Sequence, residues 1–165
     1  MTMFQEGLNT LYLDLDGVLA DFDTLGSKIL GMPTREHEQT HGTVQFYSKL
    51  RQYGSFFLDL PLMPGALELY NAVKHLKPKI LSGIPWQIPE ATTHKVAWVH
   101  KNIDPDLIVI TPRSRDKNLY CIRNDIIVDD WPQHKAKWLE KGGIWIDHRA
   151  AEESIASLKA IGVLK

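Results

Sequence analysis

Hydrophobic and polar residues follow two periods along the chain, and these periods predict strands and helices in turn. Short apolar runs bounded by turn residues indicate buried strands, and longer stretches with apolar residues three or four positions apart indicate helices. The predicted strands are residues 11–15, 78–83, 107–111, 125–130 and 143–147. The predicted helices that alternate with them are residues 65–76, 90–103, 132–142 and 150–162. This alternation is typical of a parallel α/β sheet covered on both faces.

Residues 21–62 interrupt the alternation. This segment has no convincing buried strand, and its pattern predicts two or three short helices inserted after the first strand. We therefore predict an α/β fold, a Rossmann-like three-layer parallel sheet formed by residues 1–20 and 63–165, with a small helical cap formed by residues 21–62. Ligands of open α/β sheets bind beyond the carboxyl ends of the strands, where this cap could lie over them.

Composition narrows the class of protein. The 165 residues are 44% hydrophobic and 24% charged, as in an ordinary globular domain. The formal net charge of −1 gives no reason to expect nonspecific binding to nucleic acid or to a membrane surface, and the sequence predicts no particular oligomeric state. Cys121 is the only cysteine, and no segment reads as a leader or as a membrane helix, so we expect a cytoplasmic protein.

The candidate chemistry lies where the predicted strands end. In strand order, these residues are Asp14 and Asp16, Ser82 and Gly83, Lys117 after a short loop, and Asp129 and Asp130. Parallel strands bring their carboxyl ends to one edge of the sheet, so these residues are expected to meet. Clustered acids repel one another unless a cation lies among them, and a few hard oxygen ligands suit Mg²⁺ together with a substrate phosphate.

The same residues suit phosphoryl transfer. An ionised Asp14 could attack phosphorus, Asp16 could move the proton, and the hydroxyl of Ser82 and the ammonium group of Lys117 could donate to phosphate oxygens. Gly17 would allow a sharp turn after the two acids. Taken singly, each residue has a simpler explanation as a helix cap, a turn former or a solvated charge. Their common place at the strand ends favours the phosphate site.

The stretch LYLDLDGVLADF resembles the first motif of the haloacid dehalogenase-like (HAD) phosphohydrolases. The chain then presents ILSG, Lys117 and IIVDD in the order of that superfamily's remaining motifs. Within the superfamily, four further stretches are similar to the 5′(3′)-deoxyribonucleotidases, namely DLDGVLADF, FFLDLPLMPGALE, HKVAWVHKNI and RDKNLYCIRNDIIVDD. The resemblance implies a Mg²⁺-dependent enzyme that dephosphorylates nucleoside monophosphates, a small-molecule substrate.

The resemblance also implies roles for individual residues. Asp14 would be the nucleophile and Asp16 the general acid and base. Ser82 and Lys117 would bind phosphate, and independently of the resemblance the free backbone N–H group of Gly83 could add a further donor. Phe22 matches an aromatic residue of the base pocket, and Arg115 lies beside the motif lysine and can face the substrate. The metal ligands would be Asp14, Asp129, the carbonyl group of Asp16, and Asp130 nearby.

Two departures leave the substrate open. The related pattern Thr-Ser-Pro reads Ser-Gly-Ile-Pro at residues 82–85, which removes one hydroxyl group, and the polar residues 33–42 match nothing in the family. Trp86 and Trp131 follow strand ends and either flank the pocket or pack at the edge of the core. Lys95 is expected on the solvent face of its helix. Asp21 and Asp23 receive no catalytic role.

Three alternatives remain beside a nucleotidase. The same chemistry could act on another small phosphate ester or on the phosphorylated end of a nucleic acid, although residues 21–62 lack the basic character that a nucleic acid would require. A signalling receiver domain uses similar residues, but it places its acid pair before the acceptor aspartate, whereas this chain places Asp129 and Asp130 last. A phosphate-binding module without activity is the third alternative.

Overall fold

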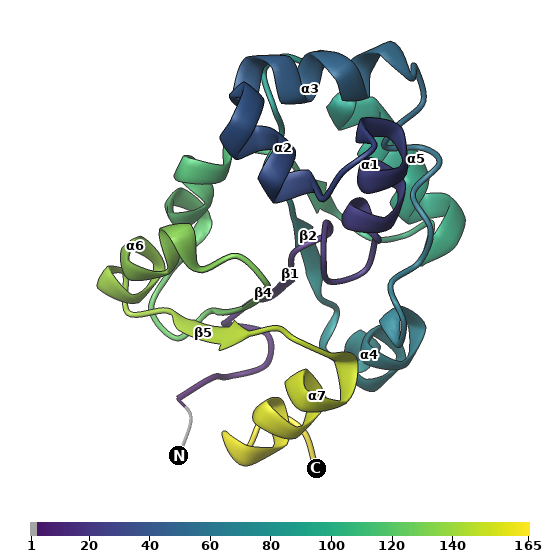
Figure 1. Cartoon of the computed structure of the whole chain (residues 1–165). Helices are drawn as coiled ribbons and strands as arrows, with labels where there is room; N and C mark the ends of the chain where they lie inside the picture. Colours follow the sequence, from purple (N-terminus) through teal and green to yellow (C-terminus); the bar gives the residue numbers. More distant parts are fainter. Residues whose placement is uncertain (1–2) are drawn as a thin grey trace.

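Five parallel strands form one sheet in the order β3-β2-β1-β4-β5. The structure is a computed structural model that describes residues 3–165. Its strands are β1 (Leu11–Leu13), β2 (Lys79–Leu81), β3 (Val109–Ile110), β4 (Ile126–Asp129) and β5 (Ile144–Asp147). Each strand lies inside a stretch that the sequence predicts, so the predicted α/β sheet is confirmed. Because β1 lies at the centre, its carboxyl end meets those of β2 and β4 (Figure 1).

Seven α-helices and three short 3-10 helices connect the strands within the described residues. The α-helices are α1 (Phe22–Leu30), α2 (Thr34–His41), α3 (Thr43–Gln52), α4 (Ala66–Val73), α5 (Ala91–Asn102), α6 (Lys135–Glu140) and α7 (Ala151–Ala160). The 3-10 helices are η1 (Lys74–Leu76), η2 (Ser114–Tyr120) and η3 (Pro132–His134). The sequence pattern does not predict η2, because a 3-10 turn has no apolar stripe of its own. No helix in the described chain has the length and apolar character that crossing a membrane would need.

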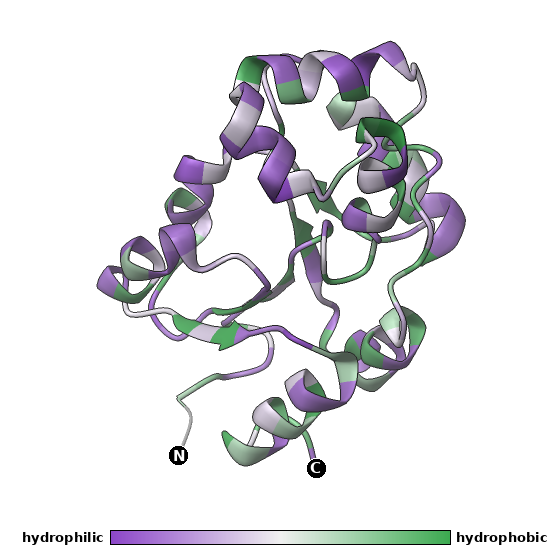
Figure 2. Cartoon of the chain, viewed as in Figure 1, coloured by the Kyte–Doolittle hydropathy of each residue, from purple (hydrophilic) through white to green (hydrophobic). Residues whose placement is uncertain are grey.

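Successive residues of each strand point to opposite faces of the sheet, and both faces are covered. Leu11 and Leu13 are fully buried in the larger core cluster, which α4, α5 and α7 complete. Tyr12 points the other way, into a smaller cluster that includes Trp138 of α6. Figure 1 shows α6 on one side of the sheet and α4 and α7 on the other, and Figure 2 shows the apolar strands between them. These three layers explain why the central strands read as continuous apolar runs.

Residues 21–62 leave and re-enter the sheet side by side. The backbone N–H group of Asp21 donates to Pro61, that of Met63 donates to Leu19, and Ala20 and Leu62 form an antiparallel bridge. Between these connections, α1, α2 and α3 pack on one another above the carboxyl end of the sheet (Figure 1). These helices are the expected content of the inserted segment, and the division of the chain into core and cap domains stays a prediction.

Candidate active site

A tight turn follows β1 and places its acids. The carbonyl oxygen of Leu15 accepts hydrogen bonds from the N–H groups of residues 18–20, and Gly17 adopts a φ of 82°. A side chain is excluded at Gly17 for a second reason, since its Cβ would lie 2.0 Å from Oδ2 of Asp130. The turn therefore brings the first acidic stretch directly against the end of β4.

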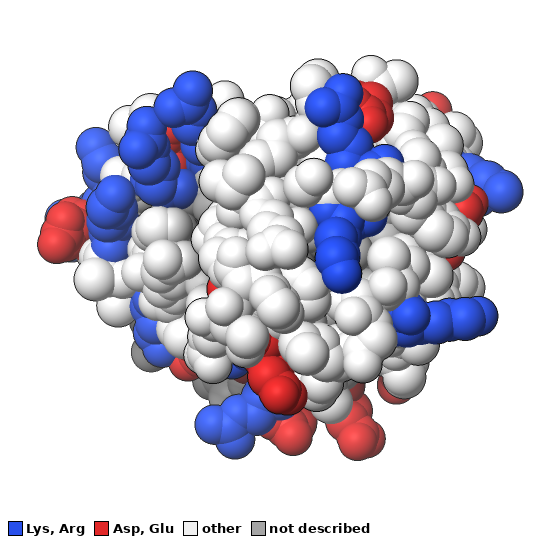
Figure 3. Space-filling view, turned by 45° about the horizontal axis from the view of Figure 1, so that its top comes forward, with Lys and Arg blue, Asp and Glu red and all other residues white. Residues whose placement is uncertain are grey.

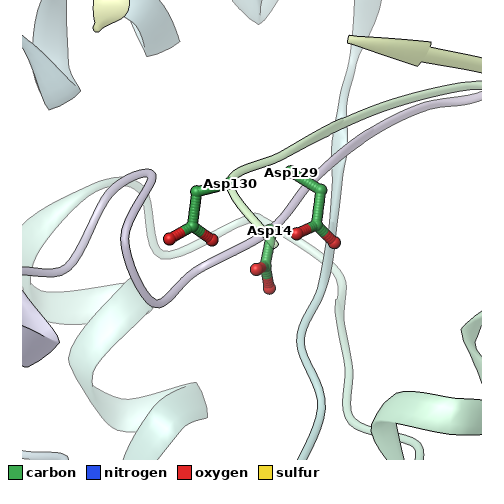
Figure 4. A group of neighbouring side chains, drawn as sticks. All are labelled: Asp14, Asp129 and Asp130. Carbon is green, nitrogen blue, oxygen red and sulfur yellow. The ribbon is translucent and has the colours of Figure 1, made fainter. Parts of the chain in front are cut away.

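Three carboxylates converge at this junction. Asp14 follows β1, Asp129 ends β4, and Asp130 comes next along the chain. One oxygen atom from each lies within 4.8 Å of the others, and Figure 4 shows the three side chains turned toward a common space. Asp14 and Asp129 are buried, so their charges are poorly screened by water. The sequence expectation that the strand ends would bring these acids together agrees with this geometry.

Lys117 lies among the acids. Its Nζ atom is 3.0 Å from Oδ1 of Asp14 and 2.8 Å from Oδ2 of Asp129. Burial opposes the charged form of Lys117, but the two carboxylates outweigh burial and raise its pKa above the ordinary value. The ammonium group therefore stays charged at physiological pH. Lys117 belongs to η2. The sequence predicts that it follows the third strand after a short loop, and the structure folds this loop into a 3-10 helix.

One lysine does not balance three acids. Burial and the charge of Asp14 raise the pKa of Asp129 to about 7. Burial, Asp14 and Asp129 together raise the pKa of Asp130 to about 8. Carboxyl groups with raised pKa values gain from a divalent cation, which makes their ionised form favourable again. The donor set, oxygen only and drawn from two adjacent strands, fits Mg²⁺.

Asp16 has a different buried partner. Oδ2 of Asp16 accepts a hydrogen bond of 2.7 Å from Nζ of Lys95, and Lys95 also donates to Ser82 Oγ at 2.9 Å and to the carbonyl oxygen of Gly83 at 2.7 Å. The other oxygen, Oδ1, is buried and has no hydrogen-bond partner among the described residues. Burial raises the pKa of Asp16 although Lys95 opposes it. A carboxyl group in this setting can carry a proton on Oδ1.

The expected place of Lys95 is wrong. Lys95 is 1% exposed, and its ammonium group lies 4.7 Å from the ring centre of Phe57. The buried stripe of α5 runs through Ala91, Lys95, Trp98 and Val99, so the stripe includes the lysine. Val96, the next residue, is only half-buried, so the buried stripe does not follow the apolar residues alone. The sequence contains one indication of this burial, because Lys95 lies four residues before Val99 and therefore on the same face of the helix.

Replacing Lys95 by Met is expected to destabilise the fold by about 1–3 kcal/mol, because the carboxyl group of Asp16 and the carbonyl group of Gly83 lose their buried hydrogen-bond donor. Urea unfolding measures this change in the free energy of unfolding. Lys101→Met is the matched control, since Lys101 is exposed on the same helix, and it should change stability by less than about 0.5 kcal/mol. Equal losses in both variants would contradict the structural role of Lys95.

The loop after β2 packs tightly against the loop after β3. A Cβ atom on Gly83 would lie 2.0 Å from Oγ of Ser114, the first residue of η2. The hydroxyl group of Ser114 therefore fills the space that a side chain at position 83 would take. Ser82 is buried beneath this contact at 1% exposure and meets the site through Lys95.

A cleft of about 1050 Å³ opens over these groups, between the core and helices α1–α3. Gly83, Phe22 and Arg115 line it, together with Asp14, Asp16, Lys117, Asp129 and Asp130. Phe22 is only partly open to the cleft, because its ring packs edge-on against Phe56 at 5.0 Å. Arg115 is exposed at the rim. Of the predicted site residues, Ser82 does not line the cleft.

Proteins with a similar sequence carry the name of a phosphatase family, the 5′(3′)-deoxyribonucleotidases. The chain is 27% identical over 139 residues to a Bordetella pertussis protein named "Putative 5′(3′)-deoxyribonucleotidase", and the match covers 74% of each chain. A protein of Acanthamoeba polyphaga mimivirus with the same family name is 28% identical over 145 residues, which span 74% of this chain and 63% of the viral one. No family model matches the sequence.

Two solved structures share the fold. A Burkholderia xenovorans protein described as a "putative haloacid dehalogenase-like hydrolase" superposes with a TM-score of 0.51 at 17% identity, over 79% of this chain and 78% of that one. An HAD hydrolase of Entamoeba histolytica superposes with a TM-score of 0.52 at 18% identity, over 95% and 91% of the two chains. The fold is therefore HAD-like, and the predicted resemblance to HAD proteins close to the deoxyribonucleotidases is confirmed.

Proposed function

We propose that the protein is a Mg²⁺-dependent phosphomonoesterase that hydrolyses nucleoside monophosphates, as a 5′-nucleotidase or deoxyribonucleotidase. One observation carries the proposal. Two carboxylates two residues apart each contact a different buried lysine, Asp14 with Lys117 and Asp16 with Lys95. This arrangement supports separate tasks for two acids of the same type, because Asp14 lies among the clustered acids beside Lys117, whereas Asp16 lies apart from them beside Lys95 and burial raises its pKa.

Asp14 is the nucleophile in this mechanism. Its Oδ1 accepts the N–H group of Leu15 and faces Lys117, which leaves Oδ2 for attack on phosphorus. As the new bond between Oδ2 and phosphorus forms, the bond between phosphorus and the ester oxygen breaks, and Asp16 gives its proton to the leaving alkoxide. Asp16 then takes a proton from the water that attacks the aspartyl-phosphate, which releases inorganic phosphate and restores Asp14.

The remaining polar groups handle charge. Lys117 faces the reacting phosphate and offsets its charge, and Lys95 fixes the orientation of Asp16. Asp14, Asp129 and Asp130 would hold Mg²⁺ with the carbonyl group of Asp16, and the ion would supply positive charge at the phosphate oxygens. On the face shown in Figure 3, Lys and Arg side chains are more prominent than acidic ones, which favours the approach of an anionic substrate.

A substrate panel tests the proposal. With Mg²⁺ present, deoxynucleoside 5′- and 3′-monophosphates are expected to have a kcat/KM at least about tenfold above that of deoxyribose 5-phosphate, because the base adds binding energy that the sugar phosphate lacks. Phosphate release measures the rates. Equal or faster hydrolysis of sugar phosphates would replace the nucleotide assignment with another phosphate ester. Absence of hydrolysis across the panel would contradict the phosphatase itself.

A further inference from the structure

An arginine of helix α2 is stacked on a tryptophan of the core. The guanidinium carbon of Arg35 lies 4.0 Å from the ring centre of Trp131. Both side chains line the cleft, and Arg35 forms no salt bridge with a carboxylate within 4.0 Å among the described residues. The contact therefore joins the inserted helices to the core across the mouth of the site.

The indole of Trp131 is held in place although it is 42% exposed. Its ring N–H group donates to Oε1 of Gln133 at 2.9 Å, and its backbone N–H group donates to Oδ1 of Asp129 at 2.9 Å. Trp131 also directly follows Asp130, one of the three clustered acids. A flat apolar surface is thus anchored beside the proposed phosphate site.

We propose that the indole face of Trp131 is the stacking surface for the nucleobase of the substrate, and that Arg35 covers this face when no substrate is bound. The inference rests on the proposed function, since it names the group that recognises the base. It gives the cleft a recognition element on the core side, whereas Phe22, the aromatic residue expected from the sequence, is engaged with Phe56.

Arg35 and the nucleobase would compete for the same face of Trp131, and the stronger of the two contacts is expected to occupy it. A cation over an exposed aromatic ring is held weakly, because water still solvates the charge. A nucleobase on the same ring gains more, since stacking buries both flat faces. The base is therefore expected to displace Arg35, whose charge remains at the rim near an anionic substrate.

The test compares a deoxynucleoside 5′-monophosphate with deoxyribose 5-phosphate, which has the same sugar and phosphate but no base. In Trp131→Ala, the ratio of the nucleotide KM to the sugar phosphate KM is expected to rise about tenfold above the wild-type ratio. Trp131→Phe keeps an aromatic face and should recover most of this loss. Arg35→Ala should lower the nucleotide KM about twofold, because the competing group is gone.

Leu139→Ala is the control for surface truncation, because Leu139 is 48% exposed on α6 and does not line the cleft. An unchanged KM ratio in Trp131→Ala would overturn the proposal. This includes an equal rise of both KM values, which would mean that Trp131 only supports the loop that carries Asp129 and does not contact the base. If neither compound is hydrolysed, the proposed function fails, and calorimetric Kd values for the same two compounds test the stacking surface independently.

Discussion

Replacement of Asp14 by Asn is expected to abolish phosphate release, with kcat reduced by at least about 10³-fold. Asparagine preserves the shape of the side chain and keeps an oxygen for the N–H group of Leu15, so the turn after β1 should persist. It lacks the negative charge that makes an oxygen nucleophilic toward phosphorus. The loss is therefore expected in kcat, while the protein remains folded. Release of inorganic phosphate from a deoxynucleoside monophosphate measures it.

A neighbouring acid controls for general charge effects. Asp147 ends β5, is exposed, and pairs with Lys135 outside the acid cluster, so Asp147→Asn should retain nearly all activity. Rapid denaturation during turnover should also trap a phosphorylated protein in the wild type and none in Asp14→Asn. Turnover in Asp14→Asn at the wild-type rate would rule out the covalent intermediate.

Removal of Mg²⁺ by EDTA is expected to silence the wild-type enzyme, and added Mg²⁺ should restore it. Asp14, Asp129 and Asp130 share one ammonium group, that of Lys117, which leaves a formal excess of two negative charges when all three acids are ionised. A divalent cation offsets this excess. It should therefore stabilise the folded chain even without substrate, because the unfolded chain does not hold the three acids together.

Thermal unfolding gives a measurement that does not depend on catalysis. At a Mg²⁺ concentration about 100 times its Kd, stabilisation is about 2.7 kcal/mol, which corresponds to a rise in Tm of about 5–10 °C for a chain of this size. Asp130→Asn should show a smaller rise, since one ligand is lost. Turnover that persists in EDTA, together with a Tm that Mg²⁺ leaves unchanged, would remove the metal from the mechanism.

The sequence predicts the strand ends well because they depend on local rules. Buried parallel strands require continuous apolar runs, and the first polar residue after each run marks the sheet edge where ligands bind. Asp14 and Asp129 are more than 100 residues apart, yet the parallel order of β1 and β4 is enough to place them together. Lys117 is not the first polar residue after its strand, because it comes from η2, a 3-10 helix that no apolar period predicts.

Lys95 shows where local rules fail. A lysine on a helix is ordinarily solvated, because burial of its charge is costly without a partner. Its partners here come from other parts of the chain. Asp16 follows β1 and is 79 residues away, and Ser82 follows β2 and is 13 residues away. The stacking of Arg35 on Trp131 has the same origin, since neither residue carries a sequence signal for the other. Such pairs follow from the assembled fold alone.

The close approach of Gly83 to Ser114 carries a consequence for the evolution of related chains. Because the Ser114 hydroxyl occupies the volume that a side chain at position 83 would need, the two positions cannot both carry one. A smaller residue at position 114 would not make room, because the backbone Cα of Ser114 would itself lie only 2.9 Å from a Cβ at position 83. Gly17 is limited in the same way, since its φ of 82° and the carboxylate of Asp130 both exclude a side chain. Along a lineage, both positions are therefore expected to stay glycine, so that changes in specificity fall on other residues that line the cleft.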